Sequence, residues 1–296
     1  MATIRARRSR AACLVFVGAM CLLTVCAVTA PHVAQARGGG GVGGGASLAD
    51  QALEQEGLAD RPVPGQWSAT LGVGAASESR YQGADSSRVK VVPLVSVRYE
   101  NFFFGPFGLG WSAINLKGFH AGPILGYQGG RSVTDSPNLS GLSDVPASVT
   151  GGAFVRCRLG RFEVLSTVRQ AVTHSSDGLD ALLKVDYRVP LIRPRLELRF
   201  GPHLGFADSE YEQTFFGITP SQSAQSGLPV FTPRGGLMDV GLQGSLTYFS
   251  TEHFALHAFA DVRRFIGDVA NSPIVRNPTE HFIGAGIAYH FGDIRH

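Results

Sequence analysis

Cysteine is scarce in this chain of 296 residues: it has four, and three of them fall near the start, Cys13, Cys21 and Cys26. They belong to a segment that opens with MATIRARRSR, which carries no acidic residue, and continues as an apolar run over 11–30. The small residues Ala34 and Ala36 follow. A basic start, an apolar run and a small-x-small ending are typical of a secretory signal peptide, and we expect cleavage near Ala36. A single membrane anchor is the alternative, because the run is nearly long enough to cross a bilayer.

Without residues 1–36, the chain has no excess of positive charge. Four of the 26 basic residues leave with that segment, so 22 remain against 23 acidic residues and the net charge is −1. Such a balance excludes a polybasic surface for nucleic acid or for an anionic membrane. Cys157 is then the one cysteine left, so an exported protein would have no internal disulfide. The remaining 260 residues suit one large β domain or two small domains.

Residues 37–65 lack the composition of a folded domain. The stretch RGGGGVGGG at their start is a flexible tether. Ser47 to Asp60 could form a short docking helix, although its apolar pattern is brief. Pro62 and Pro64 then interrupt the chain before the body of the protein. We interpret the segment as a glycine-rich periplasmic linker.

Helical periodicity is missing from Gln66 onward, and a period of two takes its place. In RLELRFGPHLGF (195–206), apolar residues at even positions alternate with charged or small residues at odd positions. The same alternation appears in 181–189, in 254–263 and, less regularly, in 90–99. Because successive side chains of a strand point to opposite faces, each segment has one apolar and one polar face. We therefore predict an all-β fold.

Two all-β classes remain, a soluble sandwich and a membrane barrel. The alternating segments are about ten to thirteen residues long, which is close to what a tilted strand needs to cross a bilayer. Aromatic residues gather at segment ends, as at Tyr99, Phe102, Trp111 and Tyr248. From residue 147 onward, tight connections alternate with long ones. This pattern predicts a transmembrane antiparallel β-barrel over residues 66–291, in the outer membrane of a Gram-negative bacterium.

A first count of strands is odd, although a single-chain bacterial barrel should have an even number. Eleven segments have the pattern: 66–76, 89–99, 102–112, 118–128, 147–158, 162–172, 179–189, 194–206, 236–249, 253–264 and 280–291. The part before residue 147 can be divided in more than one way. One hidden strand gives twelve and one false strand gives ten. We expect about twelve, with ten as the alternative.

The last predicted strand ends in GAGIAYHF (284–291), where Gly286 is followed by Tyr289 and Phe291 on one face. We interpret these residues as a signal for the barrel-assembly machinery, with a plain last strand as the alternative. The chain continues as a short tail, 292–296.

Motifs for catalysis or for cofactor binding are absent or weak. There is no HExxH and no Cys/His cluster for a metal, and the glycine run lacks the strand–turn–helix context of a phosphate loop. The stretch THSSDG (173–178) groups His174, Ser175, Ser176 and Asp177, but a triad depends on geometry rather than on adjacency. We expect no enzyme activity, no cofactor, and neither a catalytic nor a metal site.

Four aspartates in the predicted loops could gather divalent cations at the lipopolysaccharide surface: Asp85, Asp135, Asp144 and Asp268. Solvated charges at the barrel rim and turn-forming side chains are the simpler interpretation.

Charges on the polar strand faces are expected to line the lumen: Lys90, Arg98, Glu163, Arg169, Lys184, Asp186, Arg188, Arg195, Glu197, Arg199, Asp261 and Arg263. Eight are basic and four are acidic. In a barrel of ten to twelve strands such groups can pair across the interior, and together with long loops they can plug it. A narrow, mildly anion-preferring pore is the alternative.

Four loop stretches follow recognisable motifs. FIGDVANSPIV (265–275) matches L-x-G-D-A-A-D-S-P-I-V except at Phe265, Val269 and Asn271, and GRSVTDSPNLSGLSD (130–144) matches G-R-x-x-x-D-x-x-x-L-x-G-L-G-D except at Ser143. YQG at 81–83 fits P-x-Y-x-G, with Ser79 in place of proline. FFGITPSQSAQSG (215–227) resembles Y-F-G-V-S-x-x-Q-S-A-x-S-G, with an extra residue near Thr219. Over about residues 67–291 the chain thus resembles the MipA/OmpV family, at loop positions Tyr81, Gly83, Gly130, Arg131, Asp135, Gly141, Asp144, Phe216, Gly217, Gly227, Gly267, Asp268, Ser272 and Pro273.

The resemblance implies two kinds of function. One is a scaffold that assembles a murein transglycosylase with a murein polymerase at the inner face of the outer membrane. The other is a porin or channel for small solutes. The expected partners are outer-membrane lipid, lipopolysaccharide, the barrel-assembly machinery and, for the scaffold, those two peptidoglycan enzymes, with no nucleic acid.

Overall fold

The computed structural model describes residues 65–292, except 106–107, 175–176 and 194. The predicted signal peptide, the predicted linker up to residue 64 and the last four residues lie outside this part of the chain. The strands form one sheet and are β1 (Trp67–Ser79), β2 (Ser87–Tyr99), β3 (Phe102–Gly105), β4 (Gly108–Trp111), β5 (Ile114–Leu116), β6 (Phe119–Gln128), β7 (Ser148–Leu159), β8 (Phe162–Ala171), β9 (Leu179–Ile192), β10 (Leu196–Ala207), β11 (Gly236–Phe249), β12 (Phe254–Phe265) and β13 (Thr279–Gly292). The helices are η1 (Val133–Asp135), η2 (Pro137–Leu139), α3 (Ser209–Phe216), α4 (Pro220–Ser226) and η4 (Val269–Asn271).

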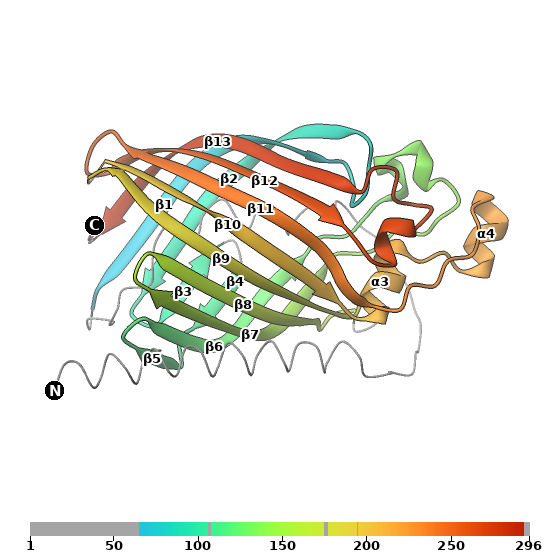
Figure 1. Cartoon of the computed structure of the whole chain (residues 1–296), viewed down its shortest axis with the longest axis horizontal. Helices are drawn as coiled ribbons and strands as arrows, with labels where there is room; N and C mark the ends of the chain where they lie inside the picture. Colours follow the sequence, from blue (N-terminus) through green and yellow to red (C-terminus); the bar gives the residue numbers. More distant parts are fainter. Residues whose placement is uncertain (1–64, 106–107, 175–176, 194, 293–296) are drawn as a thin grey trace.

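The sheet closes into a barrel because β4 pairs with β6 as well as with β3 (Figure 1). β4 and β5 lie against β6 at different heights: Gly110 is opposite Ile124, and Asn115 is opposite His120. Together they form one interrupted wall strand, so the antiparallel barrel has twelve. The expected fold and strand number are confirmed.

The strand missing from the count lies in segment 102–112, which was expected to be one strand. It is a hairpin, since β3 ends at Gly105 and β4 begins at Gly108. The run Phe102–Phe104 is apolar on both faces, so alternation gives no sign of the reversal. The glycines Gly105 and Gly108 are what indicates the turn. Gly108 has φ +112°, a conformation that residues with a side chain rarely adopt.

Strand β12 illustrates how the sequence determines the two faces, because exposed and buried residues alternate along its whole length. Leu256 and Val262 are exposed, whereas Asp261 and Arg263, on either side of Val262, are buried. The outward residues of β13 and of β1, which lies beside β13, are apolar as well, among them Leu71, Val73, Ile283 and Ile287. An outer surface of this kind suits a barrel surrounded by lipid.

The two ends of the barrel differ. At one end, here called the turn end, short connections such as 160–161 and 250–253 join the strands. At the other, the loop end, lie the connections 80–86, 129–147, 172–178, 208–235 and 266–278. In outer-membrane barrels the short turns face the periplasm, so the loop end is extracellular. Within the described residues, no helix has both the length and the apolar character needed to span a bilayer.

Candidate functional site

The long connection between β10 and β11 folds into two short helices at the loop end. Helix α3 begins after Asp208, whose side chain accepts a hydrogen bond from the backbone N–H of Tyr211 at 2.8 Å, as an N-cap should. Its first turn carries Glu210 and Glu212, which suit the positive end of the helix dipole. The helix ends at Gly217. A loop between two strands therefore contains its own helix start and stop signals.

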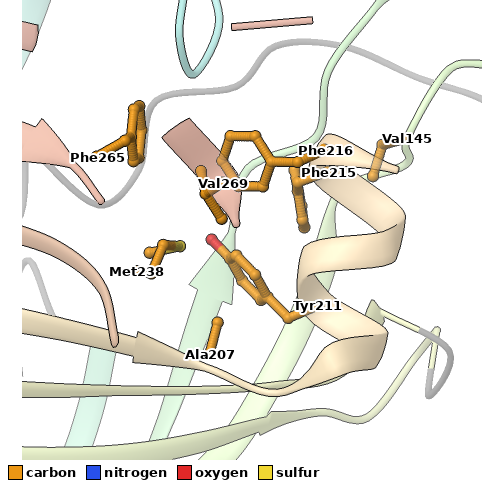
Figure 2. Packing of buried hydrophobic residues seen from close by; sticks show 8 residues of the cluster. All are labelled: Val145, Ala207, Tyr211, Phe215, Phe216, Met238, Phe265 and Val269. Carbon is orange, nitrogen blue, oxygen red and sulfur yellow. The ribbon is translucent and has the colours of Figure 1, made fainter. Parts of the chain in front are cut away.

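Helix α3 turns its apolar side toward the ends of the strands. Figure 2 shows Tyr211, Phe215 and Phe216 projecting from α3 into a cluster, here called the plug cluster, with Val145, Ala207, Met238, Phe265 and Val269. Phe216 is fully buried, and its ring packs edge-on against Phe265 at 5.3 Å. Burial of an aromatic side chain stabilises a structure by about 1.5–3 kcal/mol. α3 is thus anchored to the barrel by its packing.

A second apolar cluster lies among the loops themselves. Its fully enclosed members come from four separate connections: Tyr81, Ala84, Leu139, Leu142, Ile218 and Ile274. A backbone bridge between Ile218 and Phe231 adds a short ladder within the connection 208–235. We call the connections 80–86, 129–147, 208–235 and 266–278 together the loop cap. Because they share a core, they form one packed layer at the loop end.

Polar contacts tie the loops of the cap to one another. The buried Arg131 guanidinium donates from Nη1 to the carbonyl of Phe215 at 2.5 Å. The Ser272 hydroxyl donates to the carbonyl of Phe216 at 2.6 Å, and Tyr81 donates to the carbonyl of Ile274 at 3.1 Å. Both α3 carbonyls lie at the helix end, where no backbone partner is available within the helix. Side chains from two other loops therefore complete the C-terminus of α3.

Burial changes the acid–base properties of the cap. Loss of water lowers the pKa of Arg131 to about 10, although Tyr81, Asp144 and Asp135 favour its charged form. Burial also raises the pKa of Tyr211 to about 12. Both groups keep their usual protonation states at neutral pH. Arg131 therefore donates to α3 as a cation, which makes its hydrogen bond stronger than one between neutral groups.

The family-type loop positions expected from the sequence lie in the cap. Tyr81, Arg131, Phe216 and Ser272 meet around α3, as described above. Two glycines allow close approaches at positive φ: a Cβ on Gly83 would lie 2.8 Å from Val275, and one on Gly141 would lie 2.6 Å from Ser226. The remaining positions lie in the same layer, most of them in turns or at helix ends: Gly130, Asp135, Asp144, Gly217, Gly227, Gly267, Asp268 and Pro273.

The aspartates proposed as cation ligands do not come together. Asp135 and Asp144 both accept hydrogen bonds in the turn around Ser132. Asp268 lies at the other side of the cap, where it pairs with Arg234 at 3.3 Å. No cluster of three or more His, Cys, Asp or Glu that could hold a metal is present among the described residues. Asp135 and Asp144 therefore stabilise a turn, whereas Asp268 joins two connections of the cap and Asp85 is exposed.

One Ser–His–Asp cluster exists, but its serine is Ser148 rather than a neighbour in THSSDG. The Ser148 hydroxyl contacts His174 Nδ1 at 3.1 Å and donates a short hydrogen bond to Asp177. In a catalytic triad the acid would bind the histidine instead. Ser148 is also buried, and burial raises the pKa of Asp177. The arrangement fixes the connection 172–178 against β7.

Charged side chains on the inward faces pair within a strand or between neighbouring strands. Nearest the loop end, Arg263 lies 2.5 Å from Glu280 and Arg169 lies 2.7 Å from Asp180. Further pairs join Lys184 to Asp186, Arg199 and Arg188 to Glu197, Arg158 to Glu163, and Lys90 to Glu78. His203 lies between Asp239 and Asp261, at 3.7 and 3.3 Å. Most of these pairs follow one another from β7 to β13, and the pair of Lys90 and Glu78 lies apart on β1 and β2.

The lumen expectation differs from the structure in a few places. Arg195 lies in the exposed turn before β10, because the strand begins at Leu196. Arg98, in contrast, is half-buried on β2 and shares a face with Val92 and Leu94, as an inward residue should. The sequence reading missed several inward charges, among them Glu78, Arg156, Arg158, Asp180, Asp239 and Glu280. Applying the period of two to every residue of the predicted strands would have found most of them, since Glu280 shares a face with Phe282.

Another part of the lumen is lined by apolar residues. Val92, Leu94, Phe259 and Phe282 are buried together with two alanines, and the rings of Phe259 and Phe282 stack at 5.2 Å. A smaller group, Phe103, Ile124 and Phe154, continues this lining toward β7. We call these residues the apolar side of the lumen. An interior divided in this way differs from the polar interior of a water-filled porin.

Comparisons with known proteins found similar solved structures and a matching family. The chain is similar to OprB of Pseudomonas putida (12% identity, 67% of this chain and 58% of that chain, TM-score 0.36). It is also similar to the toluene transporter TbuX of Ralstonia pickettii (10% identity, 83% of this chain and 98% of that chain, TM-score 0.36). The chain therefore spans somewhat over half the length of OprB. No curated protein matches it. Residues 71–291 match the family model described as MltA-interacting protein MipA, and the protein, an outer-membrane barrel, belongs to that family.

Proposed function

We propose that this outer-membrane protein is a scaffold that holds a murein transglycosylase, together with a murein polymerase, at the periplasmic face of the outer membrane. The observation that carries the proposal is the loop cap, whose four connections share one apolar core over the loop end. A barrel closed by packed loops suits an anchor better than a pore. The family description, MltA-interacting protein, supports a partner of this kind.

The charged side of the lumen supports the same proposal. An open channel needs a continuous polar path, whereas most lumen charges here are engaged with a charge of opposite sign on the same or a neighbouring strand. A paired charge also loses much of its attraction for a passing ion. A narrow anion-preferring pore remains the alternative function, and it requires the cap to open.

The periplasmic partner would be held at the turn end. There the short turns, such as 160–161 and 250–253, present little surface. Residues 37–65 precede β1 and residues 293–296 follow β13, so both segments adjoin that end in sequence. We propose that the glycine-rich segment 37–65 supplies much of the contact with the enzymes.

The test is retention of a murein hydrolase by the immobilised, full-length protein from detergent extracts of the membrane. A matched variant lacks residues 38–60. We expect the intact protein to retain hydrolase activity and the shortened protein to retain much less. Stable large channels from the intact protein in planar bilayers, with no hydrolase retained, would overturn the scaffold and leave the pore.

A further inference from the structure

The wall of the barrel is incomplete between β2 and β6. β3 and β4, which form this part, have four residues each, and β2 pairs with β3 only over Val97–Tyr99. On its other side, β2 pairs with β1 along its full length. β4 meets β6 at only two residue pairs, the upper one between Leu109 and Leu125. The β3–β4 hairpin therefore fills the wall only near the turn end.

Above this hairpin, the edge of β2 is open. In the described part of the chain, no strand pairs with this edge from Val89 to Ser96. Val89 and Val91 are exposed to 76% and 73%, compared with 51% for Val73 on the neighbouring β1. At the hairpin, β2 and β6 are three strand spacings apart, or roughly 14 Å. We call the space bounded by β2, β6 and the hairpin the side window.

Cations lie where the side window meets the loop end. Arg88 pairs with Asp135 of η1 at 3.3 Å, so the connection 129–147 closes the upper rim. Arg88 and Lys90 both pair with Glu78 as well. The side chains of these two cations are 29% and 31% exposed, whereas that of Glu78 is 1% exposed. A ligand at this rim therefore meets the exposed parts of two cations, whose acidic partners Glu78 and Asp135 are more buried.

The apolar side of the lumen lies directly behind the side window. Val92 and Leu94 point inward from the same part of β2 whose edge is open. Leu94 packs on the backbone of Gly286. A Cβ added to Gly286 would lie 2.7 Å from Cδ1 of Leu94. At the lower rim, Phe103 packs edge-on against Phe154 at 5.1 Å. An apolar molecule entering from the bilayer would thus remain in apolar surroundings.

We propose that the side window binds an acyl chain of a phosphate-bearing lipid from the outer leaflet. The chain would lie along the open edge of β2 and reach Val92 and Leu94, while the phosphate would lie near Arg88 and Lys90. Open strand edges are unfavourable in hydrocarbon, and the ester, amide or hydroxyl groups of a lipid can hydrogen-bond to part of this edge. A strand from a second barrel is a poor occupant, because β2 and β6 are only roughly 14 Å apart at the hairpin and leave no room for the strands that would flank it. This inference does not depend on the scaffold proposal.

Quenching by lipids with brominated acyl chains tests the proposal. In full-length protein with Trp67→Phe and Trp111→Phe, a single tryptophan replaces Leu94 (inward, behind the window), Val91 (outward) or Leu165 (inward on β8). The proteins are reconstituted in brominated phosphatidylglycerol. We expect tryptophan at 94 to be quenched nearly as strongly as at 91, and tryptophan at 165 to be spared. Lys90→Gln should weaken the quenching at 94, and the exposed Arg264→Gln is its matched control.

Two outcomes would overturn the proposal: quenching at 91 alone, or equal quenching at 94 and 165. If the Leu94→Trp protein fails to fold, the unaltered protein is labelled with phosphatidylglycerol that carries a photoreactive acyl chain. Label on the inward residues Val92, Leu94 or Phe282 supports the side window. Label confined to outward residues such as Val89 and Val91 overturns it.

Discussion

At the scale of single residues, the cap depends on a few side chains that serve the end of one helix. Arg131 and Ser272 come from different loops, yet they satisfy consecutive carbonyls, those of Phe215 and Phe216. Leaving a buried carbonyl without a donor costs about 1–3 kcal/mol, more than the net gain from a typical hydrogen bond. These contacts therefore disfavour every other arrangement of the loops.

Gly122 lies on β6, where the pairing with β4 closes the barrel, and it should prove equally critical. A Cβ on Gly122 would lie 1.9 Å from the carbonyl oxygen of Trp111, where β4 ends and the wall strand is interrupted. We expect Gly122→Ala to lower the free energy of unfolding by about 1–3 kcal/mol, as overpacking does. The measurement is urea unfolding of the reconstituted barrel. Gly244→Ala is the control, since its Cβ would make ordinary contacts at 3.5 Å. Equal stability of the two variants would contradict this prediction.

The carboxyl of Glu212 should make the cap sensitive to pH. Burial raises the pKa of Glu212 to about 7, and Asp268 and Asp208 act in the same direction, while the N–H of Gly235 opposes them. The folded cap thus prefers the protonated acid more than the unfolded chain does, in which the pKa is 4.5. Its stability should be greatest below about pH 4.5, fall as the pH rises to about 7, and remain low above that.

Hydrogen exchange of the α3 amides checks this pH dependence. The side chain of Glu212→Gln keeps an oxygen that can accept the hydrogen bond from Gly235, but it cannot ionise. In this variant, the protection of the α3 amides against exchange, relative to a reference peptide at the same pH, should be equal at pH 5 and pH 8. In the parent protein, protection should be weaker at pH 8. Glu210 lies two residues before Glu212 and is less buried. The Glu210→Gln variant should therefore behave like the parent protein. A parent whose protection does not change between the two pH values would refute the prediction.

At the scale of elements, regular strands were predictable and short elements were not. Alternation identified β12 and β13 because it persists over more than ten residues. The β3–β4 hairpin was missed because four-residue strands are too short for a period of two to be recognised. Helix α3 was read as loop for the same reason, although Asp208 and two early glutamates signal a helix start.

The arrangement of the cap could not be predicted from the motifs alone. The motif residues Tyr81, Arg131, Phe216 and Ser272 were each recognised in their own loop. Their contacts arise only when the closed barrel brings together loops that are distant in sequence: Ser272 and Phe216 are separated by 56 positions. Family-type sequence patterns therefore indicated where the site lies, and the barrel geometry decided which residues meet.

The final strand carries the prediction that belongs to this scale. Phe291 points outward on β13, opposite Ala69, and its ring lies 4.5 Å from that of Tyr289. Gly286 faces inward, so only the two aromatic residues share the lipid face. We expect Phe291→Ala to lower the amount of folded, heat-modifiable protein in the outer membrane. Phe254→Ala removes another aromatic residue packed on Tyr289, at 4.8 Å, and should assemble normally. Equal assembly of both variants would count against a terminal signal.

At the scale of the whole molecule, the barrel is asymmetric in two directions. Along its axis, a packed cap at the loop end contrasts with bare turns at the other end. Around its circumference, most ion pairs lie on β7 to β13, whereas apolar residues line the lumen where β1 and β2 meet β12 and β13 and where β3 lies near β6 and β7. Only closure of the sheet creates the second contrast, because the apolar side joins residues from both ends of the chain. Passage along the axis is thus opposed twice, by the cap and by paired charges.

Removal of the cap should reveal how much each barrier contributes. Deleting residues 212–232 removes most of α3 and all of α4, together with the carbonyls that Arg131 and Ser272 hold. In planar bilayers we expect small, infrequent openings from the intact protein and larger, more frequent ones from the deletion. The openings of the Arg131→Met variant should be intermediate in size and frequency, since this change removes one hydrogen bond to α3 and leaves the loop in place. Arg276→Met, which changes an exposed arginine of the same cap, should match the intact protein. If the deletion leaves the openings unchanged, the paired charges of the lumen rather than the loops close the barrel.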